Sequence, residues 1–159
     1  MARMHLHISV ESLAENIRFY SALFGCGPSV EKADYAKWEL TDPAVNFAIS
    51  ARGNKPGLDH VGIQAADDAQ LGDIETRLKA ADISGLVQEG TTCCYARSDK
   101  TWVTDPQGIA WEAFHTLGDA PTFNDSTGSC GVPAQENSCC APTPAGNCCA
   151  PSPAGKSCC

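Results

Sequence analysis

Two stretches of the chain repeat the same order of strand and helix, and this duplication is the strongest constraint on the fold. Residues 4–24 read MHLHISVESLAENIRFYSALF, an apolar run followed by a helix cap at Ser12 and apolar side chains at helical spacing. Residues 58–82 read LDHVGIQAADDAQLGDIETRLKAAD and repeat that order, with Asp67 or Asp68 as the cap. Such self-similarity is typical of a fold built from copies of one unit.

Short strands are predicted after each helix. They lie at 35–40 and 45–50 in the first half, and at 87–88, 96–104 and 109–115 in the second. Val45, Phe47 and Ile49 alternate with small or polar residues, as in a half-buried antiparallel strand. Each half is predicted to be a βαβββ module, which is too small to be stable alone. We therefore predict an α+β fold in which modules of about 1–54 and 55–118 pair around a shared cleft.

The composition changes near residue 118. Residues 124–159 contain no Leu, Ile, Phe, Tyr or Trp, so they cannot bury enough apolar surface to offset the entropy of ordering. We predict that 119–159 form a flexible tail. Its adjacent cysteine pairs are predicted to bind soft metals or metalloids. These are Cys139 and Cys140, Cys148 and Cys149, and Cys158 and Cys159.

Charge and hydropathy argue against several classes of partner. The formal net charge of −8 disfavours binding to nucleic acids or to anionic lipids. No apolar run approaches the roughly 20 residues of a membrane span, and the first residues show no signal-peptide pattern. We therefore expect a cytoplasmic protein with neither nucleic-acid nor membrane partners. The chain has ten cysteines, and in that compartment its adjacent cysteine pairs are expected to be metal or metalloid ligands rather than parts of a disulfide framework.

Two histidines occupy equivalent positions of the repeat. His5 and His60 each lie five residues before the expected strand ends at Val10 and Ala65. Glu112 lies in the last predicted strand, on the opposite face from its apolar neighbours, and a buried carboxylate needs a partner there. Two histidines and a carboxylate with open positions are a ligand set of non-haem Fe(II) oxygenases, and they also resemble a catalytic zinc site. The pattern therefore predicts a metal site.

Neighbouring residues leave alternatives open. His7 shares a strand face with His5 and could replace it as a ligand, although the repeat favours His5. His115 lies on the other face from Glu112 and is predicted to be structural, as is Cys26 after the first helix. The equivalent strand of the first half offers only Asn46, Ala48 or Ser50 as a fourth ligand, and none of these is strong.

A second cluster of soft ligands lies at Cys93 and Cys94. In a regular strand the two side chains would point to opposite faces, so binding of one ligand by both requires a loop or bulge. We interpret residues 91–102 as a mobile loop that closes over a substrate. Arg97 and Lys100 follow the pair and are expected to favour its thiolate forms.

These motifs resemble a known superfamily. The duplicated module, His5, DHVGIQ at 59–64 and DPQGIAWEAF at 105–114 resemble the vicinal oxygen chelate superfamily. That group includes glyoxalase I, extradiol dioxygenases and fosfomycin or bleomycin resistance proteins. A narrower resemblance, to the ArsI organoarsenical C–As lyases and cadmium-induced proteins, rests on four features. They are FYSALFGCGP at 19–28, YAKWEL at 35–40, TTCCYARSDKTWVTDP at 91–106 and the cysteine-rich tail.

The narrower resemblance implies an enzyme of arsenic detoxification. Such an enzyme uses non-haem Fe(II) and O₂ to cleave the carbon–arsenic bond of trivalent organoarsenicals, such as methylarsenite or aromatic arsenicals, and releases arsenite. Cys93 and Cys94 would bind the arsenic, with Lys100 beside the substrate. The implied metal ligands are His5, His60 and Glu112, with Ni, Co or Zn able to substitute for iron in vitro. We expect a monomer or homodimer whose partners are the organoarsenical and O₂.

Three other functions are compatible with parts of the sequence. A non-catalytic relative could sequester arsenicals or cadmium with its tail. A glutathione-dependent, glyoxalase-like lyase would need a fourth metal ligand and leaves Cys93 and Cys94 unexplained. An extradiol ring-cleaving dioxygenase shares the ligand set but leaves the cysteines unexplained as well. A mono-organic As(III) has two exchangeable positions, which suits a site with two thiols and favours the organoarsenical reading.

Overall fold

The computed structural model of the protein describes residues 1–124, so most of the predicted tail lies outside the described residues. All strands of the described chain form one eight-stranded sheet. The first module contains β1 (Arg3–Ser9), α1 (Leu13–Phe24), β2 (Val30–Lys32), β3 (Tyr35–Thr41) and β4 (Ala44–Ser50). The second contains β5 (Gly57–Gln64), α2 (Asp68–Ala80), β6 (Leu86–Cys93), β7 (Ala96–Thr104) and β8 (Ala110–Asp119). Neither helix is long and apolar enough to span a membrane.

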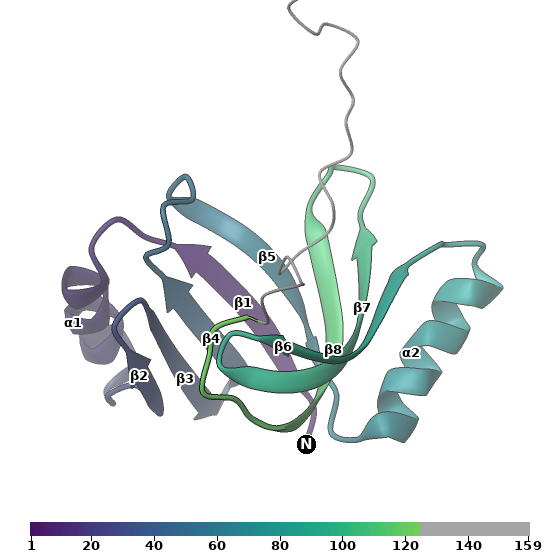
Figure 1. Cartoon of the computed structure of the whole chain (residues 1–159), viewed down its shortest axis with the longest axis horizontal. Coiled ribbons are helices and arrows are strands. Elements are labelled where there is room, and N and C mark those ends of the chain that lie inside the picture. Colours follow the sequence, from purple (N-terminus) through teal and green to yellow (C-terminus); the bar gives the residue numbers. More distant parts are fainter. Residues whose placement is uncertain (125–159) are drawn as a thin grey trace, which may run out of the picture.

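The sheet confirms the predicted pairing of two βαβββ modules. Its strand order is β2-β3-β4-β1-β5-β8-β7-β6, so the first strands of the two modules lie side by side at the centre. β1 pairs with β4 in parallel, β5 pairs with β8 in parallel, and β1 pairs with β5 antiparallel. The sheet is strongly curved, with α1 and α2 at opposite flanks (Figure 1).

Each helix covers its own module with the apolar stripe that the sequence predicts. Leu13, Ile17, Tyr20 and Phe24 of α1 pack against a core that contains Trp38, Phe47 and Ile49. Leu71, Ile74 and Leu78 of α2 pack against Ile63 and Ala113. The predicted cap at Ser12 is confirmed, and Asp67 rather than Asp68 caps α2.

The strand faces away from the helices carry the polar residues. In β1, Leu6 and Ile8 belong to the core under α1, so the alternating His5 and His7 project from the opposite face. We call this the inner face of the sheet. His60 and Glu112 lie on the same face, because their side chains contact His5.

Gly62 permits a close approach of β5 to β8 at the centre of the sheet. It is the register partner of His5 in β1 and of Glu112 in β8, so it lies between the two candidate ligands. A Cβ at this position would come within 2.0 Å of the Glu112 carbonyl oxygen. Only glycine therefore allows β5 and β8 to approach this closely.

The structure differs from the predicted elements mainly in the outer strands. β2 was not placed by sequence, because three residues give too short a pattern. β6 begins near the prediction but extends to Cys93, past a bulge between Gln88 and Thr91 that interrupts its alternation. Cys26 is exposed and follows the left-handed helix cap at Gly25, and its carbonyl accepts a hydrogen bond from Trp38 Nε1 at 3.1 Å.

Replacing Gly62 with alanine is expected to destabilise the protein by about 1–3 kcal/mol, because backbone must shift to accept the extra methyl group. Urea unfolding measures this change. Gly72→Ala is the matched control, since Gly72 lies within α2 and nothing lies within 4 Å of its would-be Cβ. That substitution is expected to be neutral or stabilising. Equal stabilities of the two variants would contradict the role of Gly62.

Candidate active site

Three candidate metal ligands converge at the junction of the two modules. His5 Nε2 lies 3.1 Å from His60 Nε2. Glu112 Oε2 lies 3.7 Å from His5 Nε2 and 3.5 Å from His60 Nε2. All three residues are buried, and one ligand atom from each lies within 4.8 Å of the others. The structure thus brings together His5, His60 and Glu112 from β1, β5 and β8, and their donor set fits a divalent cation.

Both imidazole rings are oriented by a hydrogen bond at the other nitrogen. His5 Nδ1 donates to the carbonyl oxygen of Asn46 at 3.0 Å, and His60 Nδ1 donates to Asp59 Oδ1 at 2.6 Å. Each ring therefore presents Nε2 to the centre of the site. Contacts of this kind fix the tautomer and the orientation of metal-binding histidines.

Lys100 is a fixed partner of Glu112. Its Nζ lies 2.6 Å from Glu112 Oε1, while Oε2 faces the two histidines. The two charged side chains are both buried, at 4% and 5% exposure. From the sequence, Lys100 was expected beside the substrate, and a bound cation was the expected partner of Glu112. In the structure the lysine neutralises and orients the carboxylate.

The pKa values of the three candidate ligands shift in different directions. Burial lowers the pKa of His5 to about 4, although Glu112 opposes this shift. Burial also lowers the pKa of His60, but hydrogen bonds to Asp59 and Glu112 outweigh it and raise the pKa to about 9. Burial disfavours the charged form of Glu112, yet Lys100 and His60 keep the pKa of its carboxyl well below the usual range. His60 is thus the protonated member.

His7 does not join the three ligands, so the preference for His5 agrees with the geometry. His7 Nε2 lies 2.9 Å from Ser50 Oγ, and Nδ1 lies 3.9 Å from Asp59 Oδ1. His7, Asp59 and His60 form a second cluster with ligand atoms within 4.8 Å of one another. His115 lies apart from both clusters and contacts Asp68 at the start of α2 over 2.6 Å.

The two cysteines lie at a tight turn, which corrects the predicted loop. Residues 91–102 belong mostly to the hairpin strands β6 and β7, and only Cys94 and Tyr95 form the connection. Both have left-handed backbones, with φ values of 58° and 61°. Two-residue turns of this kind match the twist of a hairpin. Because the turn breaks the alternation of the strand, the Sγ atoms of Cys93 and Cys94 lie 3.3 Å apart.

The hairpin turn is fastened to the first module. The Tyr95 hydroxyl donates to Asp34 Oδ1 at 2.6 Å, and Asp34 also forms an ion pair with Arg52. The rings of Tyr35, Tyr95 and Phe123 lie 5.7–6.0 Å apart, centre to centre. These contacts hold the cysteines over the inner face.

The expectation that basic neighbours favour thiolates is wrong for Cys94. Burial and the Glu112 carboxylate raise the pKa of its thiol to about 12, and the opposing effect of Lys100 is smaller. Lys100 forms an ion pair with Glu112, so its positive charge only partly stabilises the thiolate form of Cys94. Cys94 is therefore a neutral thiol at physiological pH.

Two chambers flank the turn. The first chamber, of 40 Å³, is lined by both cysteines, His5, Lys100 and Glu112, together with Tyr35, Lys37, Asn46, Ala96, Ser98, Phe114 and Thr116. The second chamber, of 250 Å³, is lined by His7, Ser50, Arg52, Asn54, Asp59, His60, Cys94, Phe123 and Asn124. The first chamber thus joins the sulfur atoms to the candidate metal site.

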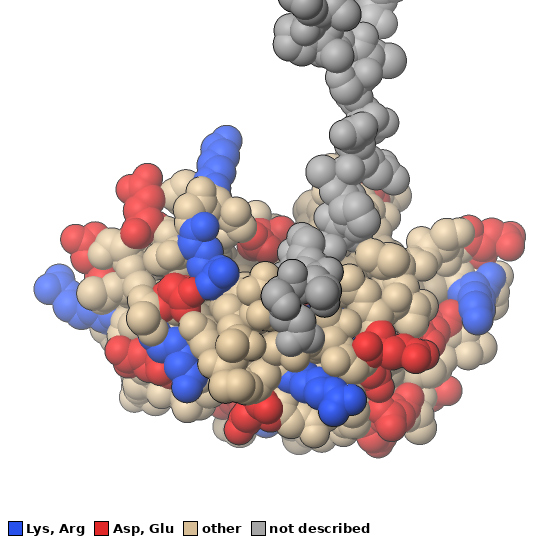
Figure 2. Space-filling view, viewed as in Figure 1, with Lys and Arg blue, Asp and Glu red and all other residues tan. Residues whose placement is uncertain are grey.

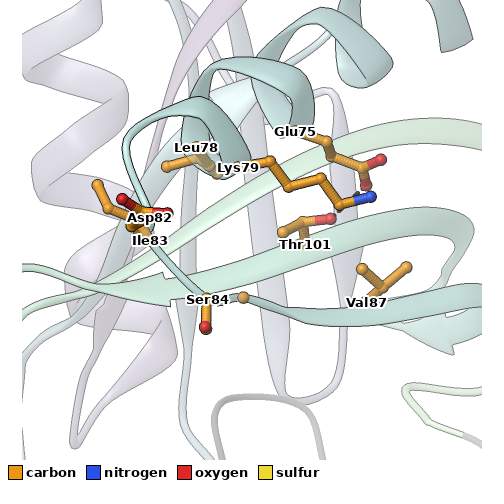
Figure 3. Close-up of a pocket in the computed structure, with 9 residues that line it drawn as sticks. Glu75, Leu78, Lys79, Asp82, Ile83, Ser84, Val87 and Thr101 are labelled. Carbon is orange, nitrogen blue, oxygen red and sulfur yellow. Dashed lines mark hydrogen bonds between the residues drawn. The ribbon is translucent and has the colours of Figure 1, made fainter.

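Other surface features of the described residues lie apart from this chemistry. A cavity of 410 Å³ lies between α2 and strands β6 and β7, where Glu75 accepts a hydrogen bond from Thr101 (Figure 3). Neither histidines nor cysteines line it. On the face shown in Figure 2, basic and acidic side chains are interspersed.

Sequence reasoning missed three contributors to the site. Asp59 directly precedes His60, and an acidic residue next to a candidate ligand was a usable signal. Gly62 could have been found by laying the predicted strands beside each other. Asp34, which fastens the turn, had no local signal because its partner Tyr95 lies 61 residues away.

The fold and the site define a class of protein, a pair of βαβββ modules with a candidate metal site where their first strands meet. Residues 3–113 match the model of the Glyoxalase/Bleomycin resistance protein/Dioxygenase superfamily. The chain belongs to this superfamily, which confirms the broad resemblance seen in the sequence.

Proteins of similar sequence show which members of the superfamily the chain resembles most specifically. The chain is 38% identical over 124 residues to a trivalent organoarsenical cleaving enzyme of Thermomonospora curvata, covering 77% of this chain and 82% of that protein. It is 40% identical over 121 residues to an enzyme of the same name from Bacillus sp. strain MD1, covering 73% and 74%. The 2,3-dioxygenase LapB of Pseudomonas sp. KL28 shares the fold, with a TM-score of 0.57, 18% identity, and coverage of 74% of this chain and 42% of that one. The narrower resemblance is thereby confirmed.

Metal affinity is expected to rise with pH up to about 9, because a cation can bind His60 only after its proton has left. His5 is already neutral above about pH 4, and Glu112 is ionised. One proton is therefore released for each metal bound, and the association constant rises about tenfold per pH unit. Titration with Mn²⁺, which prefers nitrogen and oxygen ligands to thiolates, measures this without engaging the cysteines. A flat pH response would contradict a protonated His60.

Asp59→Asn is expected to weaken metal binding about 10–100-fold, because the charged acceptor that orients His60 is lost. It should also lower the pKa of His60, so that metal affinity levels off at a lower pH. The same Mn²⁺ titration measures both effects. Asp68→Asn is the matched control, since it removes an aspartate–histidine contact of equal length outside the site. Equal losses in both variants would contradict the specific role of Asp59.

Proposed function

We propose that this chain is a non-haem Fe(II)-dependent dioxygenase that cleaves the carbon–arsenic bond of trivalent organoarsenicals and releases arsenite. The observation that carries the proposal is the shared lining of the first chamber. Cys93, Cys94, His5 and Glu112 all line this one cavity. A thiol-bound arsenic atom would therefore lie beside the metal ligands. The organoarsenical-cleaving enzymes of similar sequence support this reading.

The cysteines suit the capture of a neutral arsenical. An organoarsenical that carries two hydroxyl groups can exchange an As–O bond for an As–S bond with a cysteine thiol such as that of Cys94. Each thiol proton leaves with a hydroxyl group as water, so no net charge develops. The high pKa of Cys94 does not oppose this exchange, because neither reactant has to ionise overall. The 3.3 Å separation of the sulfurs is short enough for both to bind one arsenic atom.

The overall reaction balances with O₂ as the only co-substrate. Methylarsenite and O₂ together contain the atoms of arsenite and formaldehyde. The carbon–arsenic bond, the O–O bond and one C–H bond break; one oxygen atom goes to arsenic and takes up the methyl hydrogen as a hydroxyl group, and the other goes to carbon. Arsenic stays trivalent, and the carbon loses the four electrons that O₂ gains. Iron held by the ligand set would supply the activation of O₂.

The protein residues have distinct tasks in this reaction. His5, His60 and Glu112 would hold the iron, and Asp59 and Lys100 orient two of these ligands. The hairpin turn holds the captured arsenic next to them, which replaces a random encounter by a fixed geometry. The burial of the metal ligands keeps bulk water from the reacting atoms.

The proposal is tested by anaerobic loading with Fe(II), addition of methylarsenite with or without O₂, and separation of the arsenic species by chromatography with elemental detection. Arsenite is expected only when iron and O₂ are both present. Tight binding of methylarsenite that stays unchanged would overturn the proposal in favour of a sequestering protein.

Two single substitutions distinguish the capture of arsenic from the binding of iron. Cys94→Ser should abolish cleavage while Fe(II) affinity stays high, because Cys94 is not among the ligands. Glu112→Gln should lose Fe(II) affinity while the thiols still capture methylarsenite. Loss of iron from Cys94→Ser would contradict this division, as would full activity in either variant.

A further inference from the structure

A second group of potential metal ligands adjoins the first and shares one residue with it. His7, Asp59 and His60 each offer one ligand atom, and these atoms lie within 4.8 Å of one another. All three line the second chamber, whose 250 Å³ leaves room for water ligands. Arg52 lines the same chamber, but its positive charge is offset by an ion pair with Asp34. Two imidazole nitrogens and a carboxylate are donors that Zn²⁺ and other divalent first-row metal ions accept.

His7 presents an unused nitrogen to this group. The residue is 4% exposed, and its Nδ1 has no hydrogen-bond partner in the described part of the chain. A buried polar atom that lacks a protein partner is a candidate ligand for a water molecule or an ion. The other nitrogen, Nε2, lies 2.9 Å from Ser50 Oγ. When the Nε2–H group donates to this hydroxyl oxygen, Nδ1 carries the lone pair that a cation needs.

Asp59 lies between the two histidines. Its Oδ1 lies 3.9 Å from His7 Nδ1 and 2.6 Å from His60 Nδ1. Metal–ligand bonds of about 2.1 Å let one cation span ligand atoms up to about 4.2 Å apart, so the longer distance fits a shared cation. The shorter distance is that of a hydrogen bond, whose proton the cation has to replace. Ser9 and Asn54 hold the carboxylate in place by donating to Oδ2 at 3.2 Å and 3.3 Å.

His60 belongs to both groups of ligands through different nitrogens. Its Nε2 lies 3.5 Å from Glu112 Oε2, whereas its Nδ1 faces Asp59. A neutral imidazole carries a proton on one nitrogen and a lone pair on the other, so it binds one cation at a time. A cation between His7 and Asp59 therefore leaves the proton on His60 Nε2, which faces the first site. Binding there is expected to be weaker than at the first site, because the short, charge-assisted hydrogen bond between His60 and Asp59 has to break.

We propose that His7, Asp59 and His60 form a second binding site for a divalent first-row transition-metal ion, and that this site and the first site exclude each other. A cation held in the second site thereby blocks loading of the first. The inference goes beyond the proposed function and does not depend on it, because both sites are compared by metal binding in the absence of any arsenical.

The test is a titration of the full chain with Mn²⁺, in which EPR follows the free ion. Mn²⁺ prefers nitrogen and oxygen ligands, so the cysteines do not contribute. His5→Leu removes a ligand of the first site, yet this variant is expected to bind one Mn²⁺ at least about tenfold more weakly than wild type. Adding His7→Leu to it is expected to weaken binding at least about tenfold further. His7→Leu alone is the matched control, on the same strand face, and is expected to bind like wild type.

Two outcomes of this titration overturn the proposal. They are the absence of Mn²⁺ binding in His5→Leu, and equal affinities of His5→Leu and the double variant. The same comparison in a second background, Glu112→Gln with and without His7→Leu, guards against a failure of His5→Leu to fold. Residual binding in Glu112→Gln that does not depend on His7 overturns the proposal as well.

A second measurement identifies the nitrogens that bind the cation. In the ¹⁵N NMR spectrum of His5→Leu, Zn²⁺ is expected to shift the Nδ1 resonances of His7 and His60, while His60 Nε2 keeps its proton. Zn²⁺ bound to cysteines does not produce this pattern. Unshifted His7 resonances, or a His60 ring that binds Zn²⁺ through Nε2, overturn the proposal.

Discussion

The antiparallel pairing of β1 with β5 is the interaction on which both the fold and the site depend. It joins the two modules and lays His5 opposite Gly62, which in turn pairs with Glu112 on β8. Neither module alone contains the full ligand set, because His5 comes from the first and the other two ligands from the second. A metal ion held by this set would therefore stabilise the junction, and a change that separates the modules would weaken its binding.

The buried carboxylate of Glu112 is neutralised by side chains of the protein itself. Lys100 neutralises the carboxylate through Oε1, and the protonated His60 lies between Glu112 and Asp59. The two carboxylates and the two cationic groups of this cluster thus balance in charge. A divalent cation that enters displaces the His60 proton, so the cluster gains only one positive charge rather than two. This exchange limits the electrostatic cost of moving between the metal-free and metal-bound states.

The sequence predicted the features that repeat and missed those that join distant residues. Helix stripes, caps and the equivalence of His5 and His60 follow from local periodicity, which survives folding because each module packs on its own helix. The carboxylate of Glu112 was found because it interrupts an apolar strand. The role of Lys100 depended on the register of β7 against β8, where it lies diagonal to Glu112. Register of this kind is set by long-range pairing that local patterns do not contain.

The turn at Cys94 and Tyr95 was not predicted from the sequence, for a different reason. Left-handed backbones usually carry glycine or asparagine, and neither occurs at these two positions. Contacts of Tyr95 with Asp34 hold the turn instead, and they belong to the other module. Because the turn could not be inferred from the sequence, the nearby basic residues suggested thiolate forms of the cysteines. The burial beside Glu112, which raises the pKa of the Cys94 thiol, could not be inferred either.

The half-buried, neutral thiol of Cys94 affects which ligands this position can bind. A soft divalent cation must displace the thiol protons into solvent before it binds, and the high pKa of Cys94 opposes that release. A trivalent organoarsenical with two hydroxyl groups carries away the same protons as water. Under the proposed function, the environment that makes Cys94 a poor thiolate would therefore favour arsenicals over cations such as Cd²⁺ at this position. Selectivity at the turn would then arise from proton balance as well as from the affinity of sulfur for arsenic.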